Sequence, residues 1–499
     1  MKPRFKTVPV NSPREFLISE LFFSTTNQKG IIVSGNDVFS RVSGYPAEEM
    51  VGRPHNMIRH PDMPRAVFAL LWDYLLAGKP IAAYVKNMAA DGRYYWVLAL
   101  AAPIDGGYLS VRFKPSSPLF AIVTDIYARL REVEQAHDDR GEEPKAGMRA
   151  AEAMLGDILR GKGFADYDAF MRTMLHQELK SRDSILAREH RSMFPPLPPR
   201  HADEGPLGAA LRVMYQESQQ TYGRINSVYA QLDECARLNE QLMAQSSTIL
   251  GLTSEFRLVS FNVAVKSSKL GDTGRALSVI ATQLGDASSR VATSVSGLTS
   301  QVAAVSNWLG ETVFSLAWAR LQFEMTIVYH HEILTALSDP GRDMALSAHL
   351  SRLGDLRCAF CETIAHAGQS LRGLAAELSG LNADVGDLRK AMLSLQVTHV
   401  GGLVEARRLT EDDSFSAIFE DVRRHIDGTK AELVAFSDVI QGLGALARQA
   451  PQIMSTVSSA ADQMRRGEED LGNMVNQIGV APLAATGTYG TFQGWDTNR

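Results

Sequence analysis

Two features that would point to a membrane or to nucleic acid are missing from this sequence. No stretch of about 18 consecutive apolar residues occurs, so we expect no bilayer-spanning helix. The first residues are basic but no apolar stretch follows them, and we expect no signal peptide. The 51 Lys and Arg against 56 Asp and Glu give a net charge of -5, whereas nucleic acid binding needs a concentrated basic face. We therefore expect no membrane span and no nucleic acid partner.

Cysteine is scarce, and the common catalytic motifs are absent. Cys235, Cys358 and Cys361 are too few for a disulfide framework, which favours a reducing cytoplasm. Cys358 and Cys361 form a CxxC pair without a second ligand pair, whereas structural zinc needs four convergent ligands. No phosphate-binding loop and no nucleophile–base set occur. The sequence therefore predicts a cytoplasmic protein with no metal site and no enzymatic activity.

Residues 1–118 have the pattern of a small α+β domain. They are rich in glycine, aromatic and β-branched residues, and turn dipeptides occur at Asp91–Gly92 and Gly106–Gly107. The order is a strand, then short helices that include Pro64–Ala77, then an antiparallel meander. The expected strands include Ile31–Val33, Ala83–Val85, Tyr94–Ala101 and Tyr108–Phe113.

The rest of the chain is helical in pattern. Residues 119–204 predict a helical connector that ends in a proline-rich, semi-rigid spacer at Phe194–Pro199. Residues 205–478 predict a long antiparallel helical bundle or coiled coil, because apolar residues recur at alternating spacings of three and four. One such stripe reads Val291, Val295, Leu298, Val302, Val305 and Leu309.

Helix breakers divide the bundle region into four helices of similar length. The helices form two hairpins with tips near residues 271 and 411, which favours an up-down-up-down arrangement. Pro451 lies inside the fourth helix and should kink it. Residues 479–499 are rich in Gly, Thr and Ala and predict a disordered tail.

Motifs in the N-terminal domain carry a family resemblance. The most specific is the string from Gly52 to Pro64, GRPHNMIRHPDMP, and others lie at Gly35–Phe39 and Tyr95–Val97. With these motifs, residues 20–115 resemble the PAS domains of Aer-type aerotaxis receptors. The resemblance implies a bound FAD whose redox state is the signal. The positions that it ties to cofactor binding or signalling are Asn36, Arg59, His60, Asp62, Asn87 and Trp96.

The residues leave the cofactor open. Flavin-binding members of the family carry a tryptophan where this chain has Ile81, and an aliphatic residue lacks the flat contact surface of an indole. His55 and His60 are candidate axial ligands for haem. Arg59 could pair with a ligand phosphate or with Asp62; alternatively, these charged residues only tie down a loop. FAD, haem and an empty cavity remain the alternatives.

A second resemblance lies in the helical region. Phe256–Ala281 resembles the signalling tip of methyl-accepting chemotaxis proteins, although Lys266 stands where the family has glutamate. The resemblance implies docking of the coupling protein CheW and the histidine kinase CheA, and contact with other chemoreceptors. The residues implied in partner binding are Phe261, Asn262, Val265, Lys266, Arg275 and Val279, with Glu405 at the second tip.

The second tip resembles the first, which indicates an internal repeat. The segment Val404–Val422 is similar in sequence to Val265–Leu284, with a shorter turn. Our hypothesis is that one chain supplies both hairpins of the signalling bundle as a pseudo-dimer in cis; a homodimer is the alternative.

The two resemblances predict a cytoplasmic, chemoreceptor-like signal transducer. Its PAS domain would sense redox state, oxygen or a small ligand, and a change in the packing of the bundle would relay that state to chemotaxis array proteins. The alternative is a structural or adaptor protein, in which the PAS cavity is empty and the degenerate bundle scaffolds partner proteins.

Overall fold

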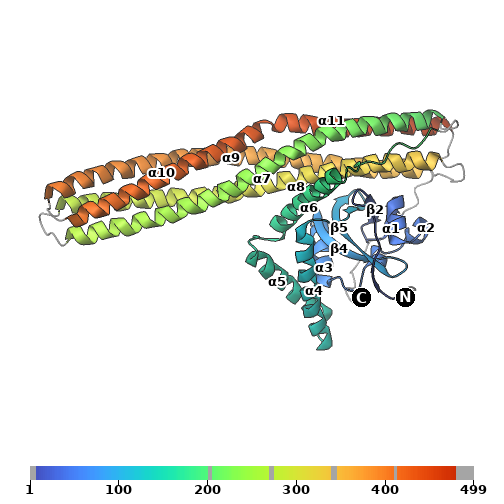
Figure 1. The fold of residues 1–499 in the computed structure, drawn as a ribbon, viewed down its shortest axis with the longest axis horizontal. Helices are drawn as coiled ribbons and strands as arrows, with labels where there is room; N and C mark the ends of the chain where they lie inside the picture. Colours follow the sequence, from blue (N-terminus) through green and yellow to red (C-terminus); the bar gives the residue numbers. More distant parts are fainter. Residues whose placement is uncertain (1–6, 201–204, 269–274, 339–345, 410–412, 479–499) are drawn as a thin grey trace. The chain divides into compact units, whose positions relative to one another are not determined.

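The computed structural model describes residues 7–200, 205–268, 275–338, 346–409 and 413–478 (Figure 1). The two predicted hairpin tips near residues 271 and 411 and the predicted tail lie outside these described residues. The chain divides into two compact units. Unit 1 consists of Met1–Tyr229, Val313–His366 and Ser455–Arg499, and unit 2 consists of Ala230–Thr312 and Ala367–Met454.

The α+β domain of unit 1 is built on one sheet, which confirms the predicted fold class. Its strand order is β1-β5-β6-β2-β3, with β4 paired to β5. The pairs β4–β5, β5–β6, β2–β6 and β2–β3 are antiparallel. Gly92 and Gly106 have positive φ in the turns of the two hairpins, as the turn dipeptides predict. The strands are β1 Val10–Pro13, β2 Leu21–Asn27, β3 Ile32–Gly35, β4 Ile81–Met88, β5 Arg93–Ile104 and β6 Gly107–Phe113.

Both faces of this sheet are covered. Long runs of β2, β4 and β5 are therefore buried at every residue instead of alternating between buried and exposed. One face lies under short helices and forms a cavity described below. The helices are α1 Asp37–Ser43, α2 Ala47–Met50, a 3₁₀ turn His55–Ile58 and α3 Arg65–Leu76.

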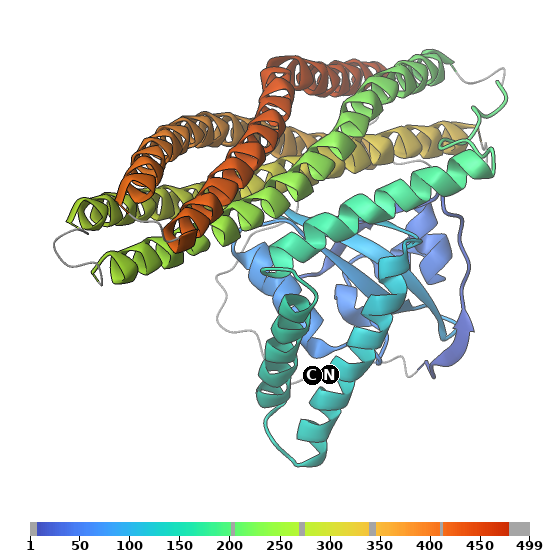
Figure 2. The same ribbon diagram turned by 60° about the vertical axis from the view of Figure 1, so that its left-hand side comes forward.

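The first and third connector helices cover the other face of the sheet, and the second packs against the first and against α3. The connector helices are α4 Pro118–Asp139, α5 Pro144–Gly161 and α6 Tyr167–Arg188, and α4 and α5 pack as a hairpin (Figure 2). Proline occupies the first turn of α4 and of α5, where its missing N–H costs no hydrogen bond. The buried Glu178 of α6 accepts hydrogen bonds from the backbone N–H of Ser116 and Ser117 (2.6 and 2.9 Å), and so satisfies donors at the start of α4.

Long helices make up the region from residue 205 onward. They are α7 Gly205–Ser268, α8 Arg275–Leu337, α9 Leu346–Leu409, α10 Asp413–Arg448 and α11 Ala450–Ile478. The predicted fourth helix is therefore divided between Arg448 and Ala450. Pro451 explains the break, because it has no N–H to donate and its ring excludes the carbonyl four residues earlier.

Unit 2 is an antiparallel four-helix bundle in its described residues. Neighbouring contacts join α7 to α8 (Asn239 Nδ2 to Ser306 Oγ, 3.0 Å) and α9 to α10 (His399 Nε2 to the Phe419 carbonyl, 2.7 Å). At Gly373 of α9 an added Cβ would lie 2.7 Å from the Trp308 indole of α8, so this close approach requires glycine. The predicted stripe from Val291 to Leu309 is buried throughout, which confirms that the spacing of three and four marks the core.

Helix α8 is buried on all sides from Val313 to Tyr329 within unit 1. One side packs in the helical bundle, and the other packs against the α+β domain and its connector. The predicted domain boundary at residue 205 therefore does not separate compact units. The buried segment includes the charged residues Arg320 and Glu324. None of the helices in the described residues has the length and apolarity that crossing a bilayer requires.

The proline-rich segment also packs against the bundle. Arg212 of α7 donates hydrogen bonds to the carbonyls of Pro198 and Pro199 (2.8 and 2.9 Å). Nε2 of His331 in α8 lies 2.9 Å from the Pro196 carbonyl. The segment predicted to be a spacer is thus held along two helices of unit 1.

Candidate functional site

A cavity lies between the sheet and the helices that cover its first face. It comprises about 890 Å³ of space free of protein atoms, with its open mouth and adjoining solvent included. The alternation of side chains along β2, β4, β5 and β6 places one set of residues on this face. The lining residues that the argument uses are Ser24, Lys29, Gly30, His55, Arg59, Phe68, Trp72, Asn87, Tyr108 and Arg112.

Arg112 of β6 places a buried positive charge in the cavity. Its side chain is 4% exposed. Nη2 donates to the Ser24 hydroxyl at 3.0 Å and lies 2.7 Å from Nε2 of His55. Nη1 has no hydrogen-bond partner among the described residues. Burial lowers the pKa of Arg112 to about 10, so the guanidinium keeps its charge at neutral pH.

His55 is a neutral partner of that charge. Burial, and then the charge of Arg112, lower the pKa of His55 to about 3. Its ring stacks on Phe39 of α1, with centroids 6.1 Å apart. Nε2 of a neutral imidazole accepts the bond from Arg112 and is not available as a metal ligand. His55 in this state therefore does not fit the role of a haem ligand.

Asn87 of β4 lines the same cavity from the neighbouring hairpin. It is 2% exposed, and its Nδ2 amide group has no hydrogen-bond partner among the described residues. A buried donor without a partner costs free energy, and a ligand carbonyl placed here would remove that cost. Arg112 and Asn87 thus offer two sets of N–H donors to a ligand.

Aromatic side chains form the wall opposite the sheet. Trp72 of α3 packs edge-on against Tyr108 of β6, with ring centroids 5.4 Å apart. Gly30, in the turn between β2 and β3, has a φ of +70°, and an added Cβ would lie 3.1 Å from the Trp72 indole. The turn and the close approach of the indole both favour glycine. Phe68 completes the wall beneath the Arg59 guanidinium, which lies 4.5 Å from the ring centroid.

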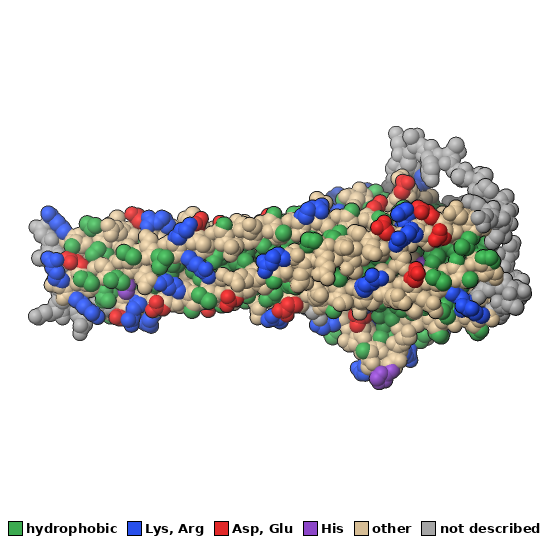
Figure 3. Space-filling model, turned by 90° about the horizontal axis from the view of Figure 1, so that it is seen from above, with side chains coloured by type: hydrophobic (Ala, Val, Ile, Leu, Met, Phe, Trp, Pro, Cys, Tyr) green, Lys and Arg blue, Asp and Glu red, His purple; other side chains and the backbone are tan. Residues whose placement is uncertain are grey.

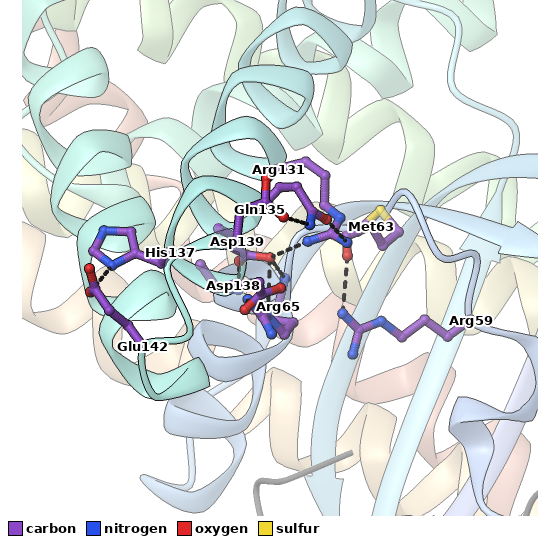
Figure 4. A network of polar contacts seen from close by, with 11 residues as sticks. Arg59, Met63, Arg65, Arg131, Gln135, His137, Asp138, Asp139 and Glu142 are labelled. Atoms are coloured by element: carbon purple, nitrogen blue, oxygen red, sulfur yellow. Dashed lines mark hydrogen bonds and ion pairs between the residues drawn. The ribbon is translucent and has the colours of Figure 1, made fainter.

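Arg59 lies at a junction between the cavity and the connector (Figure 4). Its Nη2 donates to the Met63 carbonyl at 3.0 Å. The next residues begin α3, where the backbone N–H groups of Arg65 and Ala66 donate to the buried Glu134 carboxylate of α4 at 2.9 and 2.8 Å. Burial lowers the pKa of Arg59 while Glu134 raises it. The carboxylate thus caps the helix that carries the aromatic wall.

The sequence-predicted cofactor residues separate into two groups. Arg59 and Asn87 line the cavity, whereas the others do not. The imidazole Nδ1 of His60 accepts a hydrogen bond from the Asp62 backbone (3.1 Å), and Asp62 pairs with Lys86 at 2.6 Å. His60 and Asp62 therefore tie down a loop outside the cavity, and His60 is not in a position to bind haem there.

Trp96 and Ile81 also lie away from the cavity lining. Trp96 points to the opposite face of the sheet and contacts Phe120 of α4, with centroids 5.3 Å apart. Ile81 is buried at the start of β4, paired with Ala101. Ile81 is not among the lining residues, although its strand partner Ala101 is, and Trp72 supplies an indole to the wall from α3.

Asn36 joins the α+β domain to the bundle instead of lining the cavity. It precedes α1, and its Oδ1 accepts from the backbone N–H of Phe23 (3.1 Å) and Phe39 (3.4 Å). Its Nδ2 donates to Oε1 of Glu332 in α8 at 2.7 Å. The other carboxylate oxygen of Glu332 accepts from the Asp37 backbone N–H at 3.2 Å. Glu332 thus holds the N-terminal end of α1.

Strand β2 lies between the cavity and α8. Ser24 faces the cavity and bonds to Arg112, while the adjacent Phe23 packs edge-on against Tyr329 of α8, with centroids 5.3 Å apart. Successive residues of a strand face opposite sides. A displacement of the Ser24 side chain in the cavity therefore acts on a backbone whose adjacent residue, Phe23, contacts α8.

A buried charge network joins α6 to α8 and α7. Arg182 pairs with Glu324 at 2.5 Å, and both side chains are fully buried. Arg320 forms a bidentate pair with Asp183 (2.8 and 2.6 Å) and donates to the Tyr222 hydroxyl at 3.1 Å. Burial opposes the charge of Arg320, but Tyr222, Asp183 and Glu324 raise its pKa above the ordinary value. The positive charges of the two arginines are thus neutralised by the negative charges of Glu324 and Asp183.

The predicted partner-binding residues lie in unit 2. Phe261 and Val265 of α7 and Val279 of α8 are 65%, 41% and 57% exposed, and Asn262 and Arg275 are exposed beside them. Lys266 is half-buried, and Glu405 of α9 lies 3.7 Å from Arg408. Helix α9 adds an exposed row at Leu393, Val397, Val400 and Val404. Exposed apolar rows at this spacing favour protein partners.

The charge on the bundle gives no sign of a nucleic acid partner. On the face of the described residues drawn in Figure 3, basic and acidic side chains are interspersed, with no concentrated basic area. The described residues also hold no cluster of three or more His, Cys, Asp or Glu suited to a metal ion.

Known proteins resemble the α+β domain. Residues 32–111 match the family model of the PAS fold, so this part of the chain is a PAS domain, followed by a long helical region. The aerotaxis receptor of Escherichia coli (strain K12) is 44% identical over 112 residues, which cover 21% of this chain and 22% of the receptor. The chain thus matches about a fifth of the length of that relative.

Solved structures are similar to part of this chain. The PAS domain of a protein from Colwellia psychrerythraea is 19% identical and covers 19% of this chain and 85% of that chain, with a TM-score of 0.17. A light-oxygen-voltage domain studied with a flavin analogue is 21% identical and covers 21% of this chain and 84% of that chain, with a TM-score of 0.19.

Sequence reasoning missed the residues that define the cavity chemistry. Arg112 and Trp72 carry no motif, because one is an alternating residue of β6 and the other lies on an ordinary helix face. The alternation along β6 places Arg112 on the same face as the half-buried Tyr108 and Ser110, so no local pattern marked this arginine as buried.

Proposed function

We propose that this protein is a chemoreceptor-like signal transducer that acts by binding, not by catalysis. A ligand or cofactor in the PAS cavity sets the packing of α8, and the bundle passes that state to chemotaxis array proteins. The observation that carries the proposal is the position of β2, which lines the cavity through Ser24 and contacts α8 through Phe23. The likeness of the PAS region to that of an aerotaxis receptor supports the chemotactic output.

Among the alternatives predicted from the sequence, flavin fits the cavity best. The donors of Arg112 and Asn87 suit the carbonyl edge of an isoalloxazine ring, and Trp72 and Phe68 offer apolar surface to its plane. Arg59 near the mouth suits a phosphate. A bound flavin would supply reversible redox chemistry, and with it sensitivity to redox state. Haem lacks an available histidine in the cavity.

The residues of this chain would act as follows. Arg112 holds the ligand and is held in turn by the Ser24 hydroxyl, so movement of the guanidinium acts on β2. Phe23 and Asn36 transfer that movement to Tyr329 and Glu332 of α8. Because packed helices adopt discrete arrangements, a small displacement favours one packing of α8 over another.

Partner docking is proposed for unit 2. The exposed apolar residues of α7, α8 and α9 would bind CheW, CheA or other chemoreceptors. All four helices of this bundle come from one chain, which supports a pseudo-dimer in cis. Lys266 favours the second candidate function, an adaptor that binds other partners, because a charge reversal in a polar contact turns attraction into repulsion.

The test has two parts. First, the absorption spectrum of the purified protein reports a flavin, and hydrogen exchange compares α8 in the loaded and the ligand-depleted protein. We expect exchange in residues 313–338 to change with cavity occupancy, and identical exchange would reject the transducer. Second, CheW and CheA are tested for binding. Binding that responds to cavity occupancy supports the chemotactic output, and no binding to either favours the adaptor.

A further inference from the structure

The PAS cavity has positive charge and no negative charge on its walls. Lys29, Arg59 and Arg112 line it, and no Asp or Glu is among its lining residues in the described chain. Lys29 is exposed to solvent, and Arg59 is attracted by the buried Glu134. Arg112 differs from both, because it is deeply buried and no carboxylate among the described residues raises its pKa.

Every partner of Arg112 is neutral. The Ser24 hydroxyl and the His55 imidazole accept from Nη2, and the Phe39 ring lies 5.4 Å away. Tyr95 is the one acidic group whose charge would raise the pKa of Arg112 among the described residues. Burial raises the pKa of Tyr95 well above neutrality, so the phenol stays protonated. The positive charge therefore has no counter-ion in the described part of the chain.

A buried charge without a counter-ion is costly. Proteins normally keep such charges paired, because the interior does not replace the solvation that water provides. Arg112 and Asn87 both line the cavity, and Nη1 of Arg112 and Nδ2 of Asn87 are buried without a hydrogen-bond partner among the described residues. A ligand that carries a negative charge would supply both the missing counter-ion and the missing hydrogen-bond acceptors.

We propose that the PAS cavity selects an aromatic ligand with one negative charge, held on Arg112 and with a neutral carbonyl on Asn87. Trp72 and Phe68 take the aromatic part. The inference rests on the proposed function only in that the cavity is the ligand site. Two sources share this chemistry: a flavin, whose ring system gains negative charge on reduction, and an aromatic carboxylate.

The experiment uses the full chain and three variants. Arg112→Gln removes the charge and keeps hydrogen-bonding capacity, and Arg112→Lys keeps the charge without the bidentate fork. Arg93→Gln is the matched control, because Arg93 belongs to the same sheet but is exposed and pairs with Asp91 outside the cavity. Circular dichroism checks that each variant folds, and Arg112→Lys carries the test if Arg112→Gln does not fold.

If the protein purifies with a flavin, the readout is its reduction potential. We expect Arg112→Gln to lower the potential, Arg112→Lys to stay closer to the unchanged chain, and Arg93→Gln to have no effect. A positive charge near the ring favours the more negative, reduced form, which is the reason for the direction. A potential that does not change in Arg112→Gln overturns the proposal.

If the protein purifies without a flavin, calorimetric titration with 2-naphthoate and 2-naphthamide is the readout. The two probes have the same shape and differ in charge. We expect naphthoate to bind at least about tenfold more tightly, as for a hydrogen bond to a charged group, and Arg112→Gln to abolish the preference. Equal binding of the two probes, or binding of neither, overturns the proposal.

Failure of this inference is distinguishable from failure of the transducer function. Charge-selective binding with unchanged hydrogen exchange in α8 supports the ligand class and rejects the transducer. A change of exchange in α8 on binding that does not depend on ligand charge supports the transducer and rejects the ligand class.

Discussion

The pair formed by Arg182 of α6 and Glu324 of α8 offers a quantitative test of how the PAS domain is held on the bundle. Both side chains are fully buried and 2.5 Å apart. Arg182 also donates to the carbonyls of Ile18 and Ser19, at 2.9 and 3.2 Å, in the segment that leads into β2. The pair therefore connects the connector, the bundle and the sheet.

Removing one partner leaves the other charge buried. Arg182→Met and Glu324→Leu should each lower the free energy of local opening by about 3–5 kcal/mol, the usual cost of breaking a buried ion pair. The double variant leaves no charge of this pair. In the double variant the free energy of local opening should fall by about 1–3 kcal/mol, because the carbonyls of Ile18 and Ser19 lose their hydrogen-bond donor. With single losses of about 4 kcal/mol each and a double-variant loss of about 2 kcal/mol, the coupling energy of the cycle is about 6 kcal/mol.

Native-state hydrogen exchange measures these energies without assuming that the whole chain unfolds in one step. The amides of α8 from residue 313 to residue 330 report the opening. Arg160→Met is the control, because Arg160 and Asp157 form a solvent-exposed pair at the surface of α5, and such pairs contribute little. Purely additive single effects, or an unchanged exchange in Arg182→Met, would refute the reasoning.

Three further predictions concern the cavity and its contact with α8. Glu332→Ala should lower the opening free energy of α1 and the end of α8 by about 1–2 kcal/mol, seen by hydrogen exchange, because two hydrogen bonds are lost; equal exchange in variant and parent would contradict it. Gly30→Ala should destabilise the PAS domain by about 1–2 kcal/mol, measured by urea denaturation, since its φ is positive, whereas alanine at the solvent-exposed Gly161 should have a smaller effect. The pKa of His55 is about 3 in the folded protein, against about 6.5 for an ordinary histidine, so the unfolded state binds more protons between these two pH values. Stability should therefore be complete above pH 6.5 and fall as the pH drops below it, by about 1.4 kcal/mol per pH unit, and His55→Gln should show a shallower fall in denaturation across this range; identical slopes would count against a neutral, buried His55.

The fold classes of the two regions follow from short-range patterns. Turn dipeptides at Gly92 and Gly106 predicted the hairpins, because few residues other than glycine adopt positive φ. The spacing of three and four predicted the buried stripe of α8, and Pro451 predicted the interruption between α10 and α11. Each of these features depends on neighbours within about one or two turns of chain, so the sequence contains the whole signal.

The site was less predictable. The loop motif around His60 and Asp62 is the most specific string in the sequence, yet the His60 imidazole accepts from the Asp62 backbone and the Asp62 carboxylate pairs with Lys86, both outside the cavity. Motif strength alone does not distinguish a residue that shapes a loop from one that touches a ligand. Arg112 carries no motif, but the pairing of β6 with β2 places it against Ser24 and inside the cavity.

The sequence by itself determined the PAS-like domain, the helical region and the break at Pro451, because local periodicity and backbone restrictions produce them. Only the tertiary structure decided that Arg112 is a buried charge with no counter-ion among the residues that the structure describes, and that Glu332 holds the N-terminal end of α1. Asn36 and Glu332 are 296 residues apart in the chain. No local pattern contains such a contact, because it arises from the packing of separate elements and from the burial that this packing imposes.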